Sequence, residues 1–171
     1  MPEDVLLSLF FLCIKLILMA LQVGDPAPQF TLVSSEKQEV SLSDFKGKKV
    51  VLHFFPFAFT GTCTTQLCTM RDNFGYYEGM NAQIIAISVD SPHTLAQFKK
   101  ENHYQFLLLS DFNKEVSPKY GAFYETFSLG LKGVSKRAAF VIDEDQKIAY
   151  AEVLEEAKNL PNFDAIAEAV K

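Results

Sequence analysis

Residues 50–63, VVLHFFPFAFTGTC, are an apolar run followed at once by a turn and a cysteine. The β-branched and aromatic residues of the run predict a buried central strand. The residues after it predict a helix over 62–74, with Thr60 or Thr62 as its cap. A helix N-terminus carries partial positive charge and unpaired N–H groups, which favour the reactive thiolate form of Cys63. A free cysteine is more commonly a small buried apolar residue, so a structural role competes with this chemical one.

Strands and helices alternate along the rest of the chain, which predicts an α/β fold whose sheet is covered by helices on both faces. One helix start is marked by Ser91-Pro92, because serine caps a helix and proline suits its first turn. His53, in the middle of the central strand, is expected in the core. The predicted strands lie at residues 30–33, 39–42, 49–55, 83–89, 106–109, 137–143 and 147–153, and the predicted helices at 62–74, 91–102, 113–120 and 161–170.

Length and composition fit one globular domain. The chain has 171 residues, 49% of them apolar, and can bury a sizeable core. Its net charge of -5 argues against nucleic acid as a partner, because phosphate binding needs clustered lysines and arginines. Its cysteines, an isolated pair at Cys63 and Cys68 and an outlier at Cys13, do not make a disulfide framework and suit redox work in a reducing compartment. No metal site is expected, since the C-x4-C spacing lacks a second ligand pair.

An apolar run near the N-terminus, residues 5–21, is broken only by a serine and by Lys15. It is slightly short for a membrane span, has a charge near its middle and lacks the basic flank of a signal peptide. Three interpretations stay open: an anchor or signal-like element, an amphipathic or partner-packed helix, and a dispensable extension before a natural start at Met19. We therefore divide the chain into an N-terminal extension, residues 1–20, and a folded domain, residues 21–171.

The spacing of Pro56, Thr60 and Cys63 resembles the P-x-x-x-T-x-x-C signature of the peroxiredoxins. Two more stretches, in the right order, strengthen the resemblance: residues 23–30 at the domain entry and residues 137–143, which match the strand that carries the family's active-site arginine. The residues around the cysteine look most like the AhpE-like branch and the PrxQ-like branch, also called bacterioferritin comigratory protein. The resemblance implies a thioredoxin-like fold, a central mixed sheet with helices on both faces.

The resemblance also implies roles for four residues. Cys63 would attack a peroxide and become a sulfenic acid. The Thr60 hydroxyl would hydrogen-bond the thiolate and the attacked oxygen, and Pro56 would cover the site and limit water. The guanidinium of Arg137 would favour the thiolate and orient the peroxide. From the residues alone, the threonine could equally be a helix cap, the proline a strand terminator and the arginine a solvated charge at a strand end.

Three further candidates follow the cysteine. Gln66 stands where the family often has a polar residue that holds the arginine. Arg71 is two turns beyond Cys63, so we expect it outside direct contact with sulfur or paired with an acidic neighbour. Cys68 is the candidate resolving thiol, although a disulfide to Cys63 requires the first helical turn to unwind, which Gly61 and three nearby threonines would ease. The alternative is that Cys68 is an apolar core residue and an external thiol resolves the sulfenic acid.

We therefore expect a thiol-dependent peroxidase that reduces hydrogen peroxide and organic hydroperoxides without a metal or other cofactor. Its expected partners are an external thiol reductant, such as a thioredoxin- or glutaredoxin-like protein, and a second copy in a homodimer, for which Phe57, Phe59, Phe123 and Tyr124 could serve. We expect it in the cytoplasm, with membrane association through residues 5–21 as the alternative. The alternative function is a membrane-tethered thioredoxin-like thiol–disulfide oxidoreductase, which needs a C-x-x-C pair that is absent here.

Overall fold

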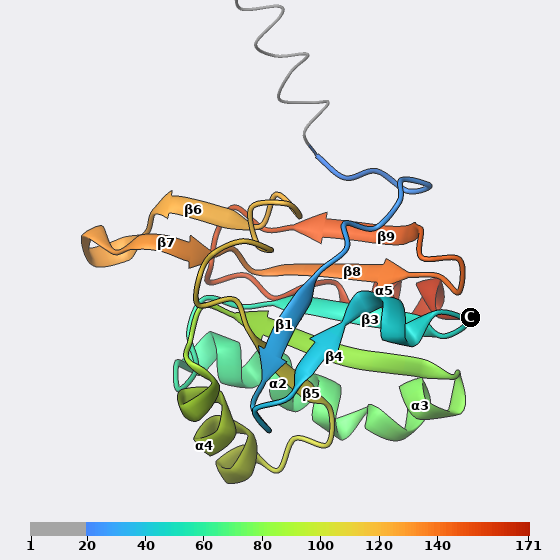
Figure 1. The fold of residues 1–171 in the computed structure, drawn as a ribbon, viewed down its shortest axis with the longest axis horizontal. Helices are drawn as coiled ribbons and strands as arrows, with labels where there is room; N and C mark the ends of the chain where they lie inside the picture. Colours follow the sequence, from blue (N-terminus) through green and yellow to red (C-terminus); the bar gives the residue numbers. More distant parts are fainter. Residues whose placement is uncertain (1–19) are drawn as a thin grey trace, which may run out of the picture.

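A computed structural model describes residues 20–171, which form one main sheet with helices packed against it (Figure 1). In this part of the chain seven strands lie in the order β2-β1-β5-β4-β3-β8-β9. β3 pairs in parallel with β4 and antiparallel with β8, so the sheet is mixed, as predicted. The strands are β1 Thr31–Ser34, β2 Glu39–Ser41, β3 Lys49–Phe54, β4 Ala82–Ser88, β5 Leu107–Ser110, β8 Ala138–Ile142 and β9 Ile148–Val153.

Three of the four predicted helices are present, as α2, α4 and α5. Serine caps α4 as predicted, because Ser91 Oγ accepts the N–H of Thr94 at 3.2 Å. The helix α3 and two short 3₁₀-helices, η1 and η2, were not predicted. α3 carries two glycines and has little sequence signal, because glycine is a poor helix former. The helices of the described residues are η1 Leu42–Phe45, α2 Gly61–Asp72, α3 Phe74–Gly79, α4 Pro92–Asn102, η2 Ser128–Gly130 and α5 Phe163–Ala169.

One face of the sheet holds the core that supports the candidate site. Leu67 of α2, Phe98 of α4 and Ile166 of α5 are fully buried and belong to one apolar cluster. The same cluster contains Val51 of β3 and Ala86 of β4. This face therefore packs against α-helices from three different parts of the chain.

The opposite face differs from the prediction that helices cover both sides. Its core, around Leu52 of β3 and Phe140 of β8, includes buried residues from η1 and from the irregular segment 111–122. Within residues 20–171, the α-helices place their buried apolar residues in the first cluster instead. The second face is thus covered by a short 3₁₀-helix and loop rather than by an α-helix.

The predicted helix over 113–120 is wrong, and the reason is local. The buried carboxylate of Asp111 accepts three successive backbone N–H groups, those of residues 115–117, at 2.7 to 3.1 Å. A side chain that takes these donors competes with helical hydrogen bonding. Pro118, which has no N–H, also opposes a regular helix.

A second, two-stranded sheet was not predicted. β6 (Phe123–Thr126) and β7 (Lys132–Ser135) pair antiparallel on either side of η2, and the hairpin extends to one side of the main sheet in Figure 1. Leu129 at its tip is 94% exposed. β6 is only half-buried to exposed, and β7 contains Gly133, so neither gives the apolar run that marks a buried strand.

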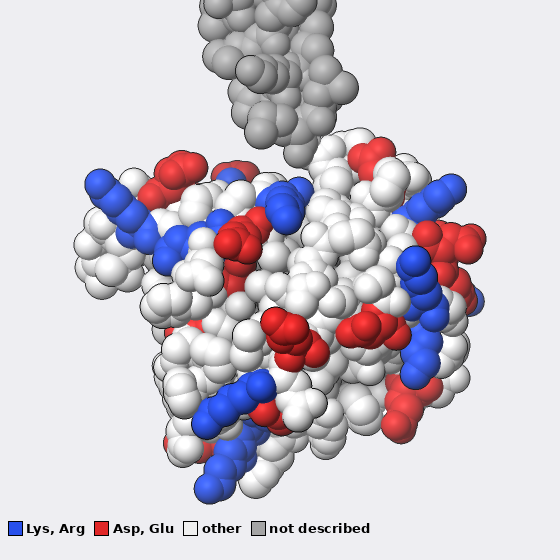
Figure 2. Space-filling view, in the orientation of Figure 1, with Lys and Arg blue, Asp and Glu red and all other residues white. Residues whose placement is uncertain are grey.

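The surface and the N-terminal segment complete the description. Figure 2 shows basic and acidic side chains interspersed over the visible face. Among residues 20–171 no helix is both long and apolar enough to cross a membrane. The predicted extension, residues 1–20, lies outside the described residues except for Ala20, as does Cys13.

The sheet register brings two distant parts of the chain together. β3 runs directly into the loop that precedes α2. In the neighbouring strand β8, Ala138 lies opposite Phe54, the last residue of β3. Arg137, immediately before β8, is therefore placed beside the start of α2, where Cys63 lies.

Candidate active site

Cys63 lies in the first turn of α2 and is only 2% exposed. Thr60 is the N-cap of this helix, with extended backbone angles of φ -105° and ψ 151°. The thiol therefore lies where the helix dipole and the unpaired backbone donors favour negative charge. Cys63 and Cys68 are both free thiols in this structure.

Arg137 holds the thiol from the other side and is itself 2% exposed. Its Nη1 and Nη2 both donate to Cys63 Sγ at 3.5 Å. Its Nε and Nη2 donate to the backbone oxygen of Ala157 at 3.0 and 2.7 Å, and its Nη1 donates to Gln66 Oε1 at 2.7 Å. These contacts engage every nitrogen of the guanidinium and fix its plane toward the sulfur.

Gln66, fully buried one turn beyond the cysteine, joins the arginine to β3. Its Oε1 accepts from Arg137, while its Nε2 donates to His53 Nδ1 at 3.0 Å and to the backbone oxygen of Phe54 at 3.4 Å. The amide thus holds Arg137 against α2. Burial, followed by the positive charge of Arg137, lowers the pKa of His53 to about 3, so its ring is neutral near neutral pH.

The loop from Pro56 to Thr60 forms one side of the site. Pro56 is buried, and the N–H of Ala58 donates to Asp90 Oδ2 at 2.8 Å. Phe59 has a positive φ of 63° although it is not glycine, and its ring lies 5.0 Å from that of Phe98. Strained backbone of this kind persists only where surrounding contacts hold it, and it is often found at functional sites.

Thr60 makes a contact other than the one we expected. Its Oγ1 donates to the backbone oxygen of Phe57 at 2.8 Å, and the structure records no hydrogen bond from this hydroxyl to Cys63. The hydroxyl proton is therefore directed to the loop, while the oxygen keeps lone pairs that can accept a hydrogen bond.

Cys68 lies one and a half turns along the same intact helix as Cys63, partly buried. Its sulfur is 3.8 Å from the hydroxyl of Tyr104. Burial, helped by this contact with Cys68, raises the pKa of Tyr104, which keeps the phenol protonated. Arg71 donates from Nε to Asp72 at 2.8 Å and from Nη1 to the backbone oxygen of Asn102 at 2.9 Å, so it bonds outside the Cys63 cluster.

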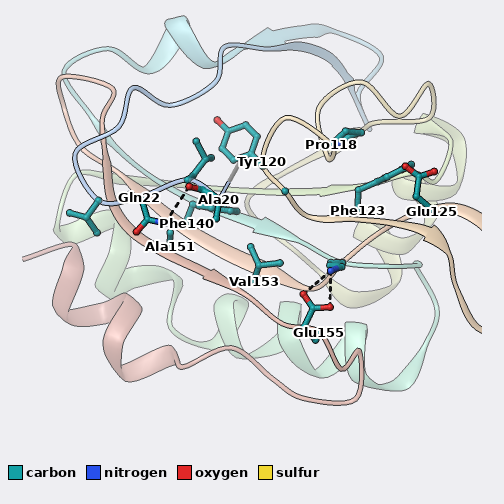
Figure 3. A pocket seen from close by; sticks show the side chains of 14 residues that line it. Ala20, Gln22, Pro118, Tyr120, Phe123, Glu125, Phe140, Ala151, Val153 and Glu155 are labelled. Carbon is teal, nitrogen blue, oxygen red and sulfur yellow. Dashed lines mark hydrogen bonds and ion pairs between the residues drawn. The ribbon is translucent and has the colours of Figure 1, made fainter. Parts of the chain in front are cut away.

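A groove of the described chain lies away from this cluster. Its volume is about 780 Å³. Figure 3 shows the side chains that line it, from the start of the domain, Tyr120 and the strands β8 and β9. One end is closed by the ion pair of Lys136 and Glu155. Cys63, Thr60 and Arg137 do not line it. Among residues 20–171 no group of three or more histidine, cysteine or acidic side chains is placed to hold a metal ion.

The structure therefore brings together Cys63, Arg137 and Gln66, and it places Pro56 and Thr60 in the adjoining loop. Sequence reasoning missed the contacts of Ala157, Asp90 and Tyr104. It also assigned His53 to the core without a role. Of these residues, only His53 had a signal in the sequence that could have been used, because it is a polar residue in an otherwise apolar strand.

Comparisons with known proteins give matches along most of the chain. The model of the AhpC/TSA family matches residues 23–151. A Mycobacterium tuberculosis protein that bears the name peroxiredoxin is 41% identical over 131 residues, which are 75% of this chain and 83% of that protein. Peroxiredoxin Bcp of Escherichia coli is 33% identical over 153 residues, which are 88% of this chain and 96% of that protein.

The fold also matches solved structures. The crystal structure of peroxidoxin BcpB from Mycobacterium tuberculosis has a TM-score of 0.78 at 28% identity, and the match covers 88% of this chain and 96% of that one. The predicted thioredoxin-like α/β fold is confirmed by this match.

Proposed function

Because the chain belongs to the AhpC/TSA family of peroxiredoxins, we propose that Cys63 is the thiol with which it attacks peroxides. The protein is a thiol-dependent peroxidase, and the resemblance to the peroxiredoxins seen in its sequence is confirmed. The observation that supports this role for Cys63 is its sulfur at a helix N-terminus, within 3.5 Å of two guanidinium nitrogens. Such surroundings favour the thiolate, the form that attacks.

The proposed reaction begins with attack of the Cys63 thiolate on one peroxide oxygen. A sulfur–oxygen bond forms as the oxygen–oxygen bond breaks, and the leaving alkoxide or hydroxide takes a proton to become an alcohol or water. The cysteine is thereby oxidised to a sulfenic acid while the peroxide is reduced. The substrates we propose are hydrogen peroxide and organic hydroperoxides.

The neighbouring residues have distinct proposed roles in this step. Arg137 stabilises the thiolate and the charge that develops on the leaving oxygen, because its position is already fixed by Gln66 and Ala157. Thr60 accepts a hydrogen bond from the peroxide, since its own proton is committed to the Phe57 carbonyl. Pro56 lacks an N–H and shields the buried thiol from water. Arg71 acts only at a distance, as support for the far end of α2.

A second thiol completes the cycle. Its sulfur attacks the sulfenic acid, forms a disulfide and releases water; an external dithiol protein of thioredoxin or glutaredoxin type then reduces that disulfide. We propose Cys68 as the attacking thiol, because it lies on the same helix as Cys63.

The assembly and the location are also proposals. We propose a homodimer, supported by apolar side chains near the site and hairpin, such as Phe59 at 50% exposure and Leu129 at 94%. Sedimentation equilibrium measures this directly. The location in the cytoplasm, a reducing compartment, stays a prediction from the cysteines. The division of the chain at residue 20 also stays a prediction.

The decisive test of the proposed function compares three variants in stopped-flow oxidation by hydrogen peroxide and by an organic hydroperoxide. We expect Cys63→Ser to abolish oxidation, and Cys13→Ser and Cys68→Ser to keep the rate of the first step. Equal rates in wild type and Cys63→Ser would refute the assignment of the attacking thiol.

A further inference from the structure

His53 lies in the middle of β3 with no exposed surface, directly beside the residue that holds Arg137. Its Nδ1 is 3.0 Å from Gln66 Nε2, Gln66 Oε1 is 2.7 Å from Arg137 Nη1, and Arg137 donates to the sulfur of Cys63. These four buried side chains form one continuous series from the sheet to the thiol. The sequence prediction had given the histidine no part in it.

Turning the amide of Gln66 over would exchange its donor end and its acceptor end. Arg137 has only donors, so it requires the amide oxygen; the NH₂ end must then face His53. With the amide reversed, the NH₂ group would oppose the guanidinium donors and the oxygen would leave Arg137. The orientation of this amide therefore decides how firmly Arg137 is held.

We propose that His53 is a positioning residue of the peroxidase site, which accepts a hydrogen bond at Nδ1 and thereby keeps the Gln66 oxygen on Arg137. The proposal rests on the role of Cys63 and Arg137 proposed above. Because Gln66 Nε2 donates, Nδ1 must be unprotonated and the single ring proton must lie on Nε2. The low pKa of His53 agrees with this neutral ring, since burial and Arg137 both oppose a second proton.

Two observations bear on the strength of this effect. The backbone oxygen of Phe54 also accepts from Gln66 Nε2, at the longer distance of 3.4 Å, so loss of the histidine should weaken the orientation without abolishing it. His53 Nε2 is buried and has no hydrogen-bond partner among residues 20–171. A residue kept for packing alone would be better apolar, because an unpartnered buried donor is unfavourable. The free Nε2 therefore supports a role that depends on Nδ1.

The experiment uses the difference between an amide and a carboxylate. The carboxylate introduced by Gln66→Glu would present an oxygen to Arg137 whichever way it turned, so it would need no orienting partner. All proteins in the comparison carry Cys13→Ser and Cys68→Ser, so that Cys63 is the one thiol. We introduce His53→Phe into this protein with Gln66 kept, called the wild-type background, and into the same protein with Gln66→Glu. The readouts are the pH profile of Cys63 alkylation and the rate of its oxidation by hydrogen peroxide.

In the wild-type background we expect His53→Phe to move the alkylation profile to higher pH and to slow oxidation about fivefold, the factor for one ordinary hydrogen bond. In the Gln66→Glu background we expect His53→Phe to change neither. Phe163→Leu is the matched control, since its ring lies 6.4 Å from that of His53 and takes no part in the series. We expect it to leave the alkylation profile unchanged.

Equal loss in both backgrounds, or no loss in either, would overturn the proposal. If His53→Phe does not fold, nitrogen NMR of the wild-type ring decides: a proton on Nε2 supports the proposal, and a proton on Nδ1 contradicts it. Failure of this inference is separable from failure of the proposed function, because alkylation of Cys63 is measured without peroxide and Cys63→Ser tests the activity itself.

Discussion

The two terminal nitrogens of Arg137 lie at the same distance, 3.5 Å, from the sulfur of Cys63. The guanidinium fork therefore shares its charge symmetrically over the thiol, which a single ammonium could not do. Because Ala157 and Gln66 take the remaining donors, the fork is held in place before any substrate arrives. Fixed charge of this kind is the most effective form of transition-state stabilisation.

We expect Arg137→Met to slow oxidation of Cys63 by hydrogen peroxide by about 30- to 900-fold. This range corresponds to about 2–4 kcal/mol, the effect of removing one preorganised donor group. Arg71→Met is the matched control: that arginine bonds to Asp72 and Asn102, and its loss should change the rate by less than about threefold. Stopped-flow measurements compare them, and an Arg137→Met rate within about threefold of wild type would contradict the role.

The Thr60 hydroxyl should matter through its oxygen. Thr60→Val keeps the shape of the side chain and removes the hydroxyl, so the Phe57 carbonyl loses its donor and the peroxide loses an acceptor. We expect oxidation to slow about tenfold or more, in line with the loss of one or two hydrogen bonds. Thr60→Ser should restore most of the rate. If serine fails to do so, the hydroxyl does not act on the reaction.

His53 should make the fold sensitive to acid. The pKa of His53 is about 3 in the folded chain, below the ordinary value of 6.5. Between these two pH values the ring is protonated in the unfolded chain and neutral in the folded chain, so acid favours unfolding. The contribution of His53 to the free energy of unfolding is fully present above about pH 6.5 and is lost as the pH falls toward 3. The loss is about 3 kcal/mol between pH 7 and pH 4. Urea unfolding at several pH values should show a flatter acid decline in His53→Phe. Parallel curves for both proteins would count against this titration.

Much of the fold was predictable because its signals are local. The apolar run that became β3, the Ser91-Pro92 start of α4 and the hairpin of β8 and β9 each depend on neighbouring residues alone. The link between Gln66 and Arg137 was also accessible, since the family resemblance suggested a polar residue that holds the arginine at this position.

The remainder depends on contacts across the chain. His53 and Gln66 meet only because β3 packs beneath α2, and the carbonyl of Ala157 reaches Arg137 only after β9 has paired with β8. The irregular segment after Asp111 is a further example: a helix was predicted over 113–120, but one buried carboxylate takes the N–H groups that the helix would have used.

A chain that begins at Met19 should fold and reduce peroxide at a rate within about twofold of the full chain. The domain entry is already fixed downstream, because Gly24 donates to the carbonyl of Ile148 at 2.8 Å and Ile148 donates to that of Asp25 at 2.9 Å. Backbone bonds of this kind hold a terminus to a sheet. Thermal unfolding and stopped-flow oxidation compare the two chains. Loss of folding in the shorter one would show that residues 1–18 are part of the domain.

The resolving role of Cys68 depends on how readily the first turn of α2 unwinds. Three threonine hydroxyls in this helix donate to carbonyls four residues back, as Thr64 does to Thr60 at 2.8 Å and Thr65 to Gly61 at 3.1 Å. Such contacts compete with helical hydrogen bonding, and threonine is itself a weak helix former. The turn that separates the two thiols is therefore a weak part of an otherwise packed helix.

We expect a disulfide between Cys63 and Cys68 after treatment with one equivalent of peroxide, found by mass spectrometry of the alkylated protein. Thr64→Ala with Thr65→Ala should strengthen the turn by about 1 kcal/mol, and so slow disulfide formation about fivefold. Sulfenic acid formation should be unaffected, because both hydroxyls donate to backbone carbonyls rather than to the sulfur. Cys68→Ser should then accumulate the sulfinic acid faster. A lasting sulfenic acid at Cys63 beside a free Cys68 would assign resolution to an external thiol, since the helix would then hold its thiols apart throughout the cycle.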